Sequence, residues 1–519
     1  MQAPSKTFEA RSPKLTSLAR FQTSGFGLRT SKFSLVLSCI VSVLALPPLL
    51  AAPQAPAAAD AVITLSGTVT PADKGTYQEH AFVVPAGVTR IDVDFGYENK
   101  GKGTELEVGL FDTQRFRGTS RFSKDHFHLT EFEATPSYLT GPLPAATWRL
   151  SLGIPSIGPG QSSRWTATIR LSSGDAPTAG LGPVLKAQAG WYVGDLHAHT
   201  LHSDGFGCVD PGTTTARGCQ PWEVVEAARA RHLDFLAITD HNTTSHHADL
   251  ATLQEGLTSL LLLRGQELTT FHGHANVYGT SRPIDFRLGF NGRSMNDVVD
   301  DVGREHALLS INHPGRETGD ACTGCGWDAA STPWNRIEAM EVVNGGIIEG
   351  PTAGMPFWYA RLNEGYRIAA IGGSDDHGAR SPRGHIGSPA TVVYARELSE
   401  TGLLDGIRAG RAYVRTRGPE GPTLDLAGAT GETHVLMGGI LDVAREGTPV
   451  RLMLHAVGAA GQRAEIVRNG EVIATLTVTT ADQELSYALA MTPGQWVHVR
   501  LRDAAGVTAF TNPVYARAF

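Results

Sequence analysis

The sequence predicts an α/β protein in which a barrel of strands and helices lies between two β-sandwich domains. Two changes of hydrophobic rhythm support this prediction. Residues 61–185 and 419–519 contain short runs in which apolar and polar residues alternate, as in strands with one buried face. Residues 186–418 instead have nearly continuous apolar strand segments separated by helical segments. That order favours a parallel sheet, covered on its outer side and closed or partly closed into a barrel.

The first 60 residues are predicted to be a signal peptide and a leader of small residues. Basic residues precede an apolar run over residues 33–52, and small residues follow it. A membrane anchor is the alternative, but two prolines interrupt the apolar run, so we favour a signal that is cleaved between Ala51 and Ala61. The mature protein is then expected to be exported, periplasmic or extracellular, with no stable membrane span.

The flanking regions predict only short strands. In the first region they begin at Ala61, His80, Ile91, Leu106, Trp148 and Trp165. Residues 172–183, rich in Gly, Pro and Ala, are the predicted linker to the barrel. In the last region strands are predicted to begin at Val450, Arg463, Val472 and Trp496.

The central region alternates between the two kinds of element. Strands are predicted over residues 191–200, 234–239, 260–265, 307–311, 337–343 and 366–371. Helices are predicted over residues 221–232, 247–257, 295–306, 356–364 and 398–408.

The composition indicates which class of partner the protein binds and in which kind of compartment it resides. A net charge of -7 with 18% charged residues leaves no basic patch, which excludes nucleic acid and favours a small molecule. Four cysteines follow the signal, and an oxidising compartment permits disulfides between Cys208 and Cys219 and between Cys322 and Cys325. A thiolate zinc site is the alternative for the second pair, less favoured because no second C-x-x-C accompanies it.

Polar residues recur where the predicted barrel strands end. His197 and His199 are two apart, so on a strand both rings point the same way and can hold one metal ion, although a polar strand face explains this pair equally well. Loops after barrel strands carry active sites, and further candidate ligands follow later strands: Asp204, His241, Glu267, His274, His313, Asp375 and His377. Together they predict a metal cluster, and imidazole with carboxylate suits Zn²⁺, Mn²⁺ or Fe²⁺.

These segments resemble the motifs of the PHP (polymerase and histidinol phosphatase) superfamily of metallohydrolases. The similar segments are Asp195-Leu-His-Ala-His-Thr with Ser203-Asp-Gly, Ile238-Thr-Asp-His-Asn, Gly265-Gln-Glu, Gly273-His-Ala-Asn, Asn312-His-Pro-Gly and Gly373-Ser-Asp-Asp-His-Gly. The β-rich flanks, Gly410-Arg-Ala-Tyr-Val and Thr511-Asn-Pro-Val-Tyr are similar to the CehA/McbA group. The resemblance is strong over residues 190–417 and weaker outside.

The resemblance implies a distorted (β/α)7-type barrel with two or three divalent metal ions. The nine candidate ligands match the family's ligand positions, with Glu267 in a bridging place. Some members have histidine where this chain has Asp204, which leaves the metal set open. His202 and His272 are expected to support the ligands or to lie exposed, and Asp376 is a candidate acid or base.

The resemblance and general metal chemistry imply hydrolysis of an ester by a metal-bridging hydroxide. We favour a phosphate ester, which a three-metal site would attract, over a carbamate or carboxylic ester of the CehA/McbA type. Arg316 and Arg411 are candidate contacts for an anionic substrate. Of the two, we predict a catalytic role for Arg316. A non-catalytic exported binding protein is the remaining alternative, but every candidate ligand is present.

Overall fold

The structure is a computed structural model that describes residues 60–121, 124–131, 133–135, 137–173, 182–210, 212–318, 324–379 and 384–519. Residues 1–59, most of the predicted linker and Cys322 lie outside the described residues. The signal peptide, the linker and the Cys322–Cys325 disulfide therefore stay predictions. No described helix has both the length and the apolar character that a membrane crossing requires.

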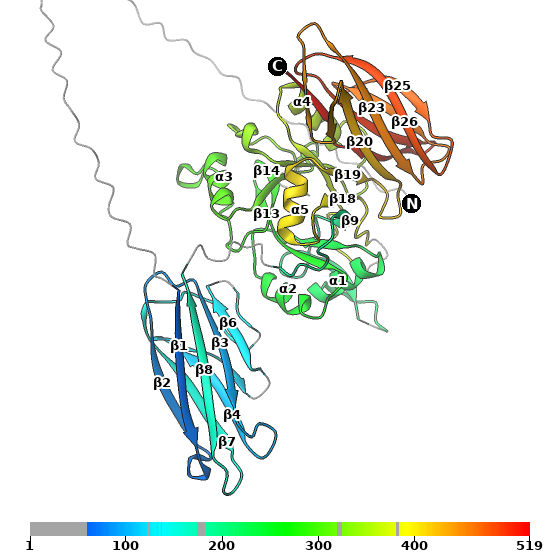
Figure 1. Cartoon of the computed structure of the whole chain (residues 1–519). Helices are drawn as coiled ribbons and strands as arrows, with labels where there is room; N and C mark the ends of the chain where they lie inside the picture. The colour runs from blue at the N-terminus through cyan, green and yellow to red at the C-terminus, as the bar shows by residue number, and fades with distance from the viewer. Residues whose placement is uncertain are drawn as a thin grey trace, which may run out of the picture. The chain divides into compact units, whose positions relative to one another are not determined.

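Residues 61–172 form two four-stranded antiparallel sheets with a shared apolar core (Figure 1, blue to cyan). One sheet has the order β1 (Ala61–Val69), β8 (Ser163–Ser172), β3 (Arg90–Tyr97) and β6 (His126–Thr130). The other has the order β2 (Tyr77–Val84), β7 (Ala146–Ser156), β4 (Glu105–Phe111) and β5 (Phe116–Arg121). Each predicted strand start lies in one of these strands. Alternation explains the arrangement, since in β3 Ile91, Val93 and Phe95 are buried and the residues between them are not.

A row of strands forms the central region, and it mixes parallel and antiparallel pairs. β9 (Gly190–Asp195), β12 (Phe235–Ile238) and β13 (Leu261–Thr270) are parallel, as are β15 (Leu308–Asn312), β16 (Ala339–Asn344) and β17 (Ala369–Gly373). Between these two groups, β14 (Gly273–Tyr278) is antiparallel to both of its neighbours. The expectation of a wholly parallel sheet is therefore wrong at β14, which forms a hairpin with β13.

The predicted helices are all present, with slightly different bounds. They are α1 (Pro221–Ala230), α2 (His247–Gln254), α3 (Met295–Arg304), α4 (Gly354–Asn363) and α5 (Glu400–Arg408). Among the described residues no α-helix joins β15 to β16, and none joins β13 to β14. The α/β class is confirmed in this coarse form, as a strand-rich α/β fold with few helices, whereas a regular alternation of strand and helix is not observed.

The central row of strands runs from β9 to β17, and the segments that follow these two strands contact each other. The Asp375 amide donates to the His197 carbonyl at 2.8 Å, and the His199 amide donates to the Asp376 carbonyl at 2.9 Å. A parallel bridge between Ala198 and Asp376 accompanies these bonds. The segments that follow β9 and β17 therefore lie side by side, at the carboxyl ends of the strands, where most of the predicted site residues lie.

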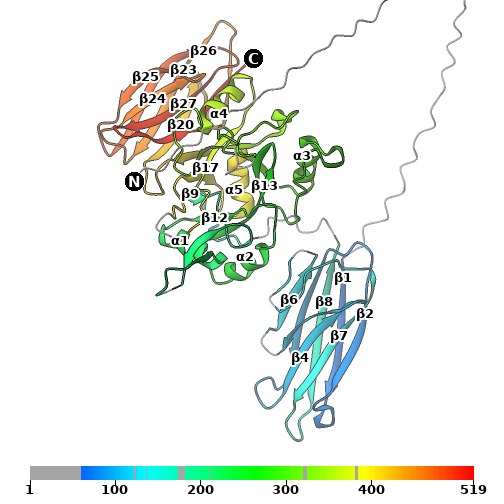
Figure 2. The same ribbon diagram turned by 180° about the vertical axis from the view of Figure 1, so that it is seen from behind.

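The last strands extend the same sheet beyond the predicted domain boundary at residue 418. β18 (Ala390–Ala395) pairs with β9 and with β19 (Ala412–Arg415), and β19 pairs with β28 (Gly506–Thr511). From there the sheet continues to β27 (Trp496–Asp503), β24 (Arg463–Arg468) and β25 (Glu471–Thr477), which Figure 2 shows from behind. β29 (Val514–Ala518) pairs with β27 and with β22 (Ile440–Val443). A second sheet of four strands has the order β21 (Thr433–Leu436), β20 (Thr423–Thr430), β23 (Thr448–Val457) and β26 (Asp482–Met491). The C-terminal strands thus share hydrogen bonds with the central region.

Candidate metal centre

His197 and His199 follow β9 on a backbone that remains extended. Because the Asp375 and Asp376 segment pairs with it, successive side chains alternate in direction and the two rings share one side. Both rings are buried, and their Nε2 atoms are 3.1 Å apart. The structure thus brings the two histidines together as the spacing predicts.

Two carboxylates complete a four-atom group around this pair. Asp375 Oδ1 lies 3.3 Å from His197 Nε2 and 3.1 Å from His199 Nε2. Glu267 Oε2 lies 3.4 Å and 3.5 Å from the same two atoms. A tetrahedral ion with bonds of about 2.0–2.1 Å requires ligand atoms about 3.3–3.4 Å apart. These five distances are close to that value, and His197, His199 and Glu267 form a group that could hold a metal ion.

A second group of donors adjoins the first and is more open. Asp204 Oδ1 lies 3.3 Å from His377 Nε2 and 3.5 Å from His241 Nε2. The His199 ring packs against the His241 and His377 rings, with centroids 4.4 Å and 4.1 Å away. The side chains of Asp204 and His377 are 59% and 37% exposed. These four residues could hold one metal ion, on the side that solvent reaches.

Glu267 lies between donors on two sides. Its Oε2 faces His197 and His199, whereas its Oε1 lies 3.3 Å from His274 Nδ1 and 3.6 Å from His313 Nε2. Asn312 Nδ2 donates to Oε1 at 2.9 Å, whereas the buried Oε2 pairs with His241 Nδ1 at 2.8 Å in a geometry that does not make a hydrogen bond. A buried, unsatisfied carboxylate oxygen is costly unless a cation lies against it. The residues therefore fit a metal ion, and the carboxylate has the orientation of a bridging ligand.

Histidine charges offset the buried carboxylates of this cluster. Burial raises the pKa of Glu267 and of Asp375, but the charge of His197, together with the charges and hydrogen bonds of neighbouring histidines, outweighs burial and holds both pKa values well below their ordinary range. Burial lowers the pKa of His199 to about 4, so its ring is neutral and free to act as a ligand. Burial also lowers the pKa of His377, but its hydrogen bond to Asp204 and the charge of Asp375 raise it to about 9. The carboxylates thus attract positive charge, which divalent cations can supply.

The backbone is strained at two of the donors. His313 has a φ of 29° and Asp375 a φ of 54°, both in the left-handed region that residues other than glycine rarely adopt. Such conformations cost on the order of 1–3 kcal/mol each and persist where surrounding contacts hold them. His313 directly follows β15 and Asp375 lies two residues beyond β17, so the strain coincides with the turning of these side chains toward the cluster.

Two buried carboxylates that support the donors were not predicted. Asp195 Oδ1 accepts from the His197 and Ser374 amides, at 3.1 Å and 2.9 Å, and its Oδ2 accepts from the Gly387 amide. Glu341, on β16, lies 3.0 Å from His197 Nδ1. A carboxylate inside an otherwise apolar strand was the available signal for Glu341, because such a charge is rarely buried without partners.

The predicted acid or base and the predicted anion contacts lie in different surroundings. Asp376 accepts from the Gly378 amide at Oδ1 and from the His385 amide at Oδ2, so its oxygens hold the following loop. Arg316 lies beside the cluster, with Nη1 3.7 Å from Asp375 Oδ2 and a hydrogen bond to Asn344. Arg411 pairs with Asp425 and packs over Trp191 at the start of β9, so it does not lie at the cluster.

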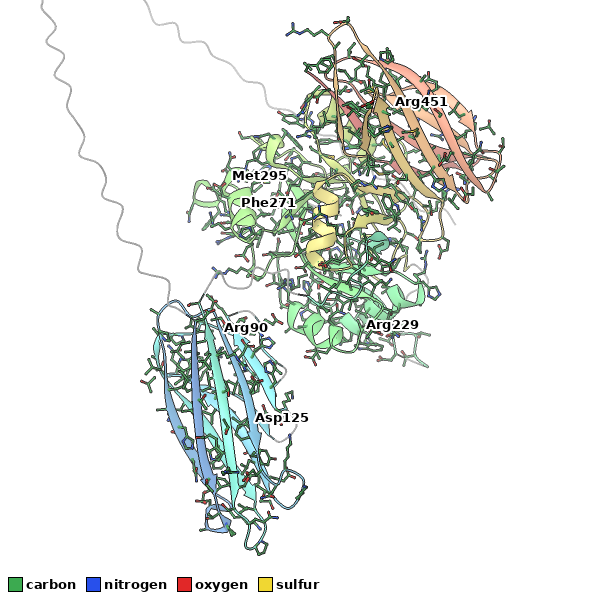
Figure 3. The ribbon with its side chains drawn as sticks, viewed as in Figure 1. Arg90, Asp125, Arg229, Phe271, Met295 and Arg451 are labelled. Atoms are coloured by element: carbon green, nitrogen blue, oxygen red, sulfur yellow. A yellow bond between two sulfur atoms is a disulfide. The ribbon has the colours of Figure 1, made fainter. Side chains whose placement is uncertain are left out.

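The remaining predicted polar residues lie outside the cluster. His202 contacts Ser245 and Asp249, at 2.8 Å and 2.9 Å, and His272 contacts Asp328. Phe271, beside His272 at the turn between β13 and β14, is 80% exposed (Figure 3). These placements agree with supporting or exposed roles for the two histidines.

The disulfide between Cys208 and Cys219 is confirmed, with Cα atoms 5.1 Å apart. The disulfide joins β10 (Phe206–Val209) to the residue after β11 (Ala216–Gly218). The linked segment begins shortly after Asp204 in the chain. Cys325 is also disulfide-bonded, which argues against a thiolate zinc site there.

A cleft of about 560 Å³ lies at the other ends of the strands. Its polar lining includes His306, Arg336, Glu338, Arg367 and Arg408. None of the nine candidate ligands lines it, and Arg408 and Arg336 already pair with Glu338 and Asp300. The converging donors, rather than this cleft, therefore define the candidate site.

Comparisons with known proteins add little to this geometry. No family model and no curated protein matches the chain. One solved structure, a Bifidobacterium adolescentis protein for which metal-dependent phosphoesterase activity has been suggested, is 16% identical and covers 37% of this chain and 90% of its own, with a TM-score of 0.27. A similarity this low carries no argument about fold or activity. The site is therefore interpreted from its own residues.

Proposed function

We propose that the chain is an exported metal-dependent hydrolase of ester bonds, of the PHP type and similar to the CehA/McbA group, and that it cleaves a phosphate ester. The observation that carries the proposal is that His197 Nε2 and His199 Nε2 lie 3.1 Å apart and that each lies 3.1–3.5 Å from both Glu267 Oε2 and Asp375 Oδ1. Divalent metal ions bound there would lower the pKa of a water molecule and neutralise charge on the reacting oxygen.

The donor groups support a site for two or three ions of Zn²⁺, Mn²⁺ or Fe²⁺. Three overlapping groups are candidates: His197 with His199 and Glu267; His199 with Asp204, His241 and His377; and His241 with Glu267 and His274. The carboxylates of Asp204, Glu267 and Asp375 together with one hydroxide carry a charge of about -4. Two divalent ions would make the net charge of the site about zero, and three would make it about +2. Three groups of donors therefore favour an anionic substrate.

Arg316 is the residue that we assign to the substrate's anionic oxygen. Its side chain is 29% exposed, and its Nη1 lies on the outer side of Asp375. Its buried Nε donates no hydrogen bond to any described residue, so the guanidinium retains a donor. Arginine binds phosphate oxygens through such paired donors.

A carbamate or carboxylic ester is the second candidate, favoured by the contacts that Arg316 already makes. Asn344 and Asp375 both contact this guanidinium, which offsets its attraction for an anion. A two-metal site of near-zero charge would then accept a neutral ester.

The test is a substrate panel on protein whose metal content has been measured. We expect bound divalent metal and turnover of aryl phosphates, with both lost in His197→Ala while the variant keeps the circular dichroism spectrum of the parent. Carbamate turnover without phosphatase activity would reverse the choice of substrate. A parent that binds no metal and turns over no ester would reject the hydrolase and leave the binding-protein alternative. Equal activity in parent and variant would remove His197 from the mechanism. Fractionation of the source cells tests export separately.

A further inference from the structure

Glu341 is a buried carboxylate whose two oxygens have different partners. It lies on β16 and is 2% exposed. Oε1 lies 3.0 Å from His197 Nδ1. Oε2 accepts from the His313 amide at 3.2 Å and from Asn344 Nδ2 at 2.8 Å. Every described contact of this side chain therefore leads to the metal cluster or its support.

We infer that Glu341 sets the tautomer of His197 and so makes its Nε2 atom available as a ligand. A carboxylate only accepts hydrogen bonds, so Nδ1 of His197 must carry the proton that lies against it. In the neutral ring the lone pair is then on Nε2, the atom that faces Glu267 and Asp375. Glu341 is thus a positioning residue, and this inference rests on the metal-binding part of the proposed function.

The same carboxylate holds donors that follow three different strands. His197 follows β9, His313 follows β15, and Asn344 Nδ2 also lies 3.3 Å from Oδ2 of Asp375, which follows β17. Gly373 permits this close packing, because a Cβ atom there would lie 2.4 Å from His197 Cβ and 2.5 Å from Glu341 Oε1. The arrangement leaves little room for either side chain to turn.

The partners of Oε2 make Glu341→Gln a sharp test. The His313 amide and the Asn344 amide both donate, so the variant must direct its carbonyl oxygen toward them. Its NH2 group then faces His197 Nδ1, which can accept only if the ring's proton moves to Nε2. The size of the side chain is unchanged, but the atom that should bind metal now carries hydrogen.

The experiment compares the full-length parent with Glu341→Gln, Glu341→Asp and Glu338→Gln. Glu338 precedes the same strand but pairs with Arg408 at the far end, so it is the matched control. Zn²⁺ affinity is measured by chelator competition, bound Co²⁺ by its visible absorption, and folding by circular dichroism. Loss of such supporting partners typically weakens metal binding about 10–100-fold. We expect a loss of this size in Glu341→Gln, a smaller one in Glu341→Asp, and parent affinity in Glu338→Gln.

The outcomes separate this inference from the proposed function. A parent that binds no Zn²⁺ or Co²⁺ rejects the metal site itself, and with it the basis of the inference. A parent that binds metal, with equal affinity in Glu341→Gln, overturns the role of Glu341 alone. If Glu341→Gln binds as tightly as or more tightly than Glu341→Asp, the tautomer argument is wrong, because the carboxylate would then contribute nothing that the amide lacks. The Asp variant also decides the case if the Gln variant does not fold.

Discussion

Because His498 is buried, we expect the free energy of unfolding to fall measurably in acid. It lies on β27 and is fully buried, with Nδ1 donating to the Thr511 carbonyl at 3.2 Å and Nε2 2.7 Å from the Tyr359 hydroxyl of α4. Burial and the charge of Arg500 lower its pKa to about 3. In the unfolded chain the pKa returns to about 6.5. Between these values the unfolded state binds more protons, so stability falls as the pH drops below about 6.5.

The size of the effect follows from the same two pKa values. A pH of 5 lies about 1.5 units below the pKa of the unfolded histidine. At about 1.36 kcal/mol per unit, protonation of the unfolded state lowers the free energy of unfolding by about 2 kcal/mol relative to pH 8. His498→Gln should remove this part of the acid loss, although it also lowers stability at pH 8 through lost ring packing.

The assay is urea unfolding at pH 8 and pH 5, with a chelator present so that release of metal does not contribute. Tryptophan fluorescence follows the relevant region, since Trp358 and Trp496 lie 5.6 Å and 6.0 Å from the His498 ring. His455→Gln is the control, because that ring is 46% exposed on β23 and should leave the acid loss in place. An acid loss in His498→Gln as large as in the parent would refute the reasoning.

Two further variants test the surroundings of the cluster. Cys208→Ala with Cys219→Ala opens a cross-link between residues 11 apart, and the loss of unfolded-state constraint should lower the free energy of unfolding by about 3 kcal/mol; an unchanged urea midpoint would contradict this. Asp376→Asn should destabilise the protein by about 1–3 kcal/mol with metal content unchanged, because an amide offers one oxygen to the two amides that Asp376 accepts from. Lost turnover at unchanged stability would instead support the acid or base role.

Local patterns were sufficient for most of the elements that carry the site. Period-3.6 segments predicted the helices, and apolar runs predicted β12, β13 and β15 to within a few residues. β14 was missed because its six residues, Gly273–Tyr278, have no alternation and are fully buried. The pairing of β19 with β28 was missed for another reason. It joins residues 413–415 to residues 509–511, and no local pattern specifies so distant a partner.

The residues of the candidate site also include some that a local pattern predicts and others that it does not. The nine ligand candidates were predicted because each follows the expected end of a strand, and strand ends meet at one edge whatever the intervening sequence. Seven of them do follow a strand in the structure, whereas Glu267 lies within β13 and His274 within β14. Glu341 lies within a strand, and its partner His197 is 144 residues away in the chain. Its importance depends on which ring lies opposite, and that is a property of the folded sheet.

Asp376 shows why the spacing rule for strands does not extend to every pair of site residues. His197 and His199 were predicted to share a side because residues two apart on a strand point the same way. The bridge between Ala198 and Asp376 places the second segment beside the first, but Asp375 has a φ of 54°, so this segment is not an extended strand. Its side-chain directions depend on the folded surroundings: Asp375 and His377 contact the other donors, whereas Asp376 accepts from the Gly378 and His385 amides and holds the following loop.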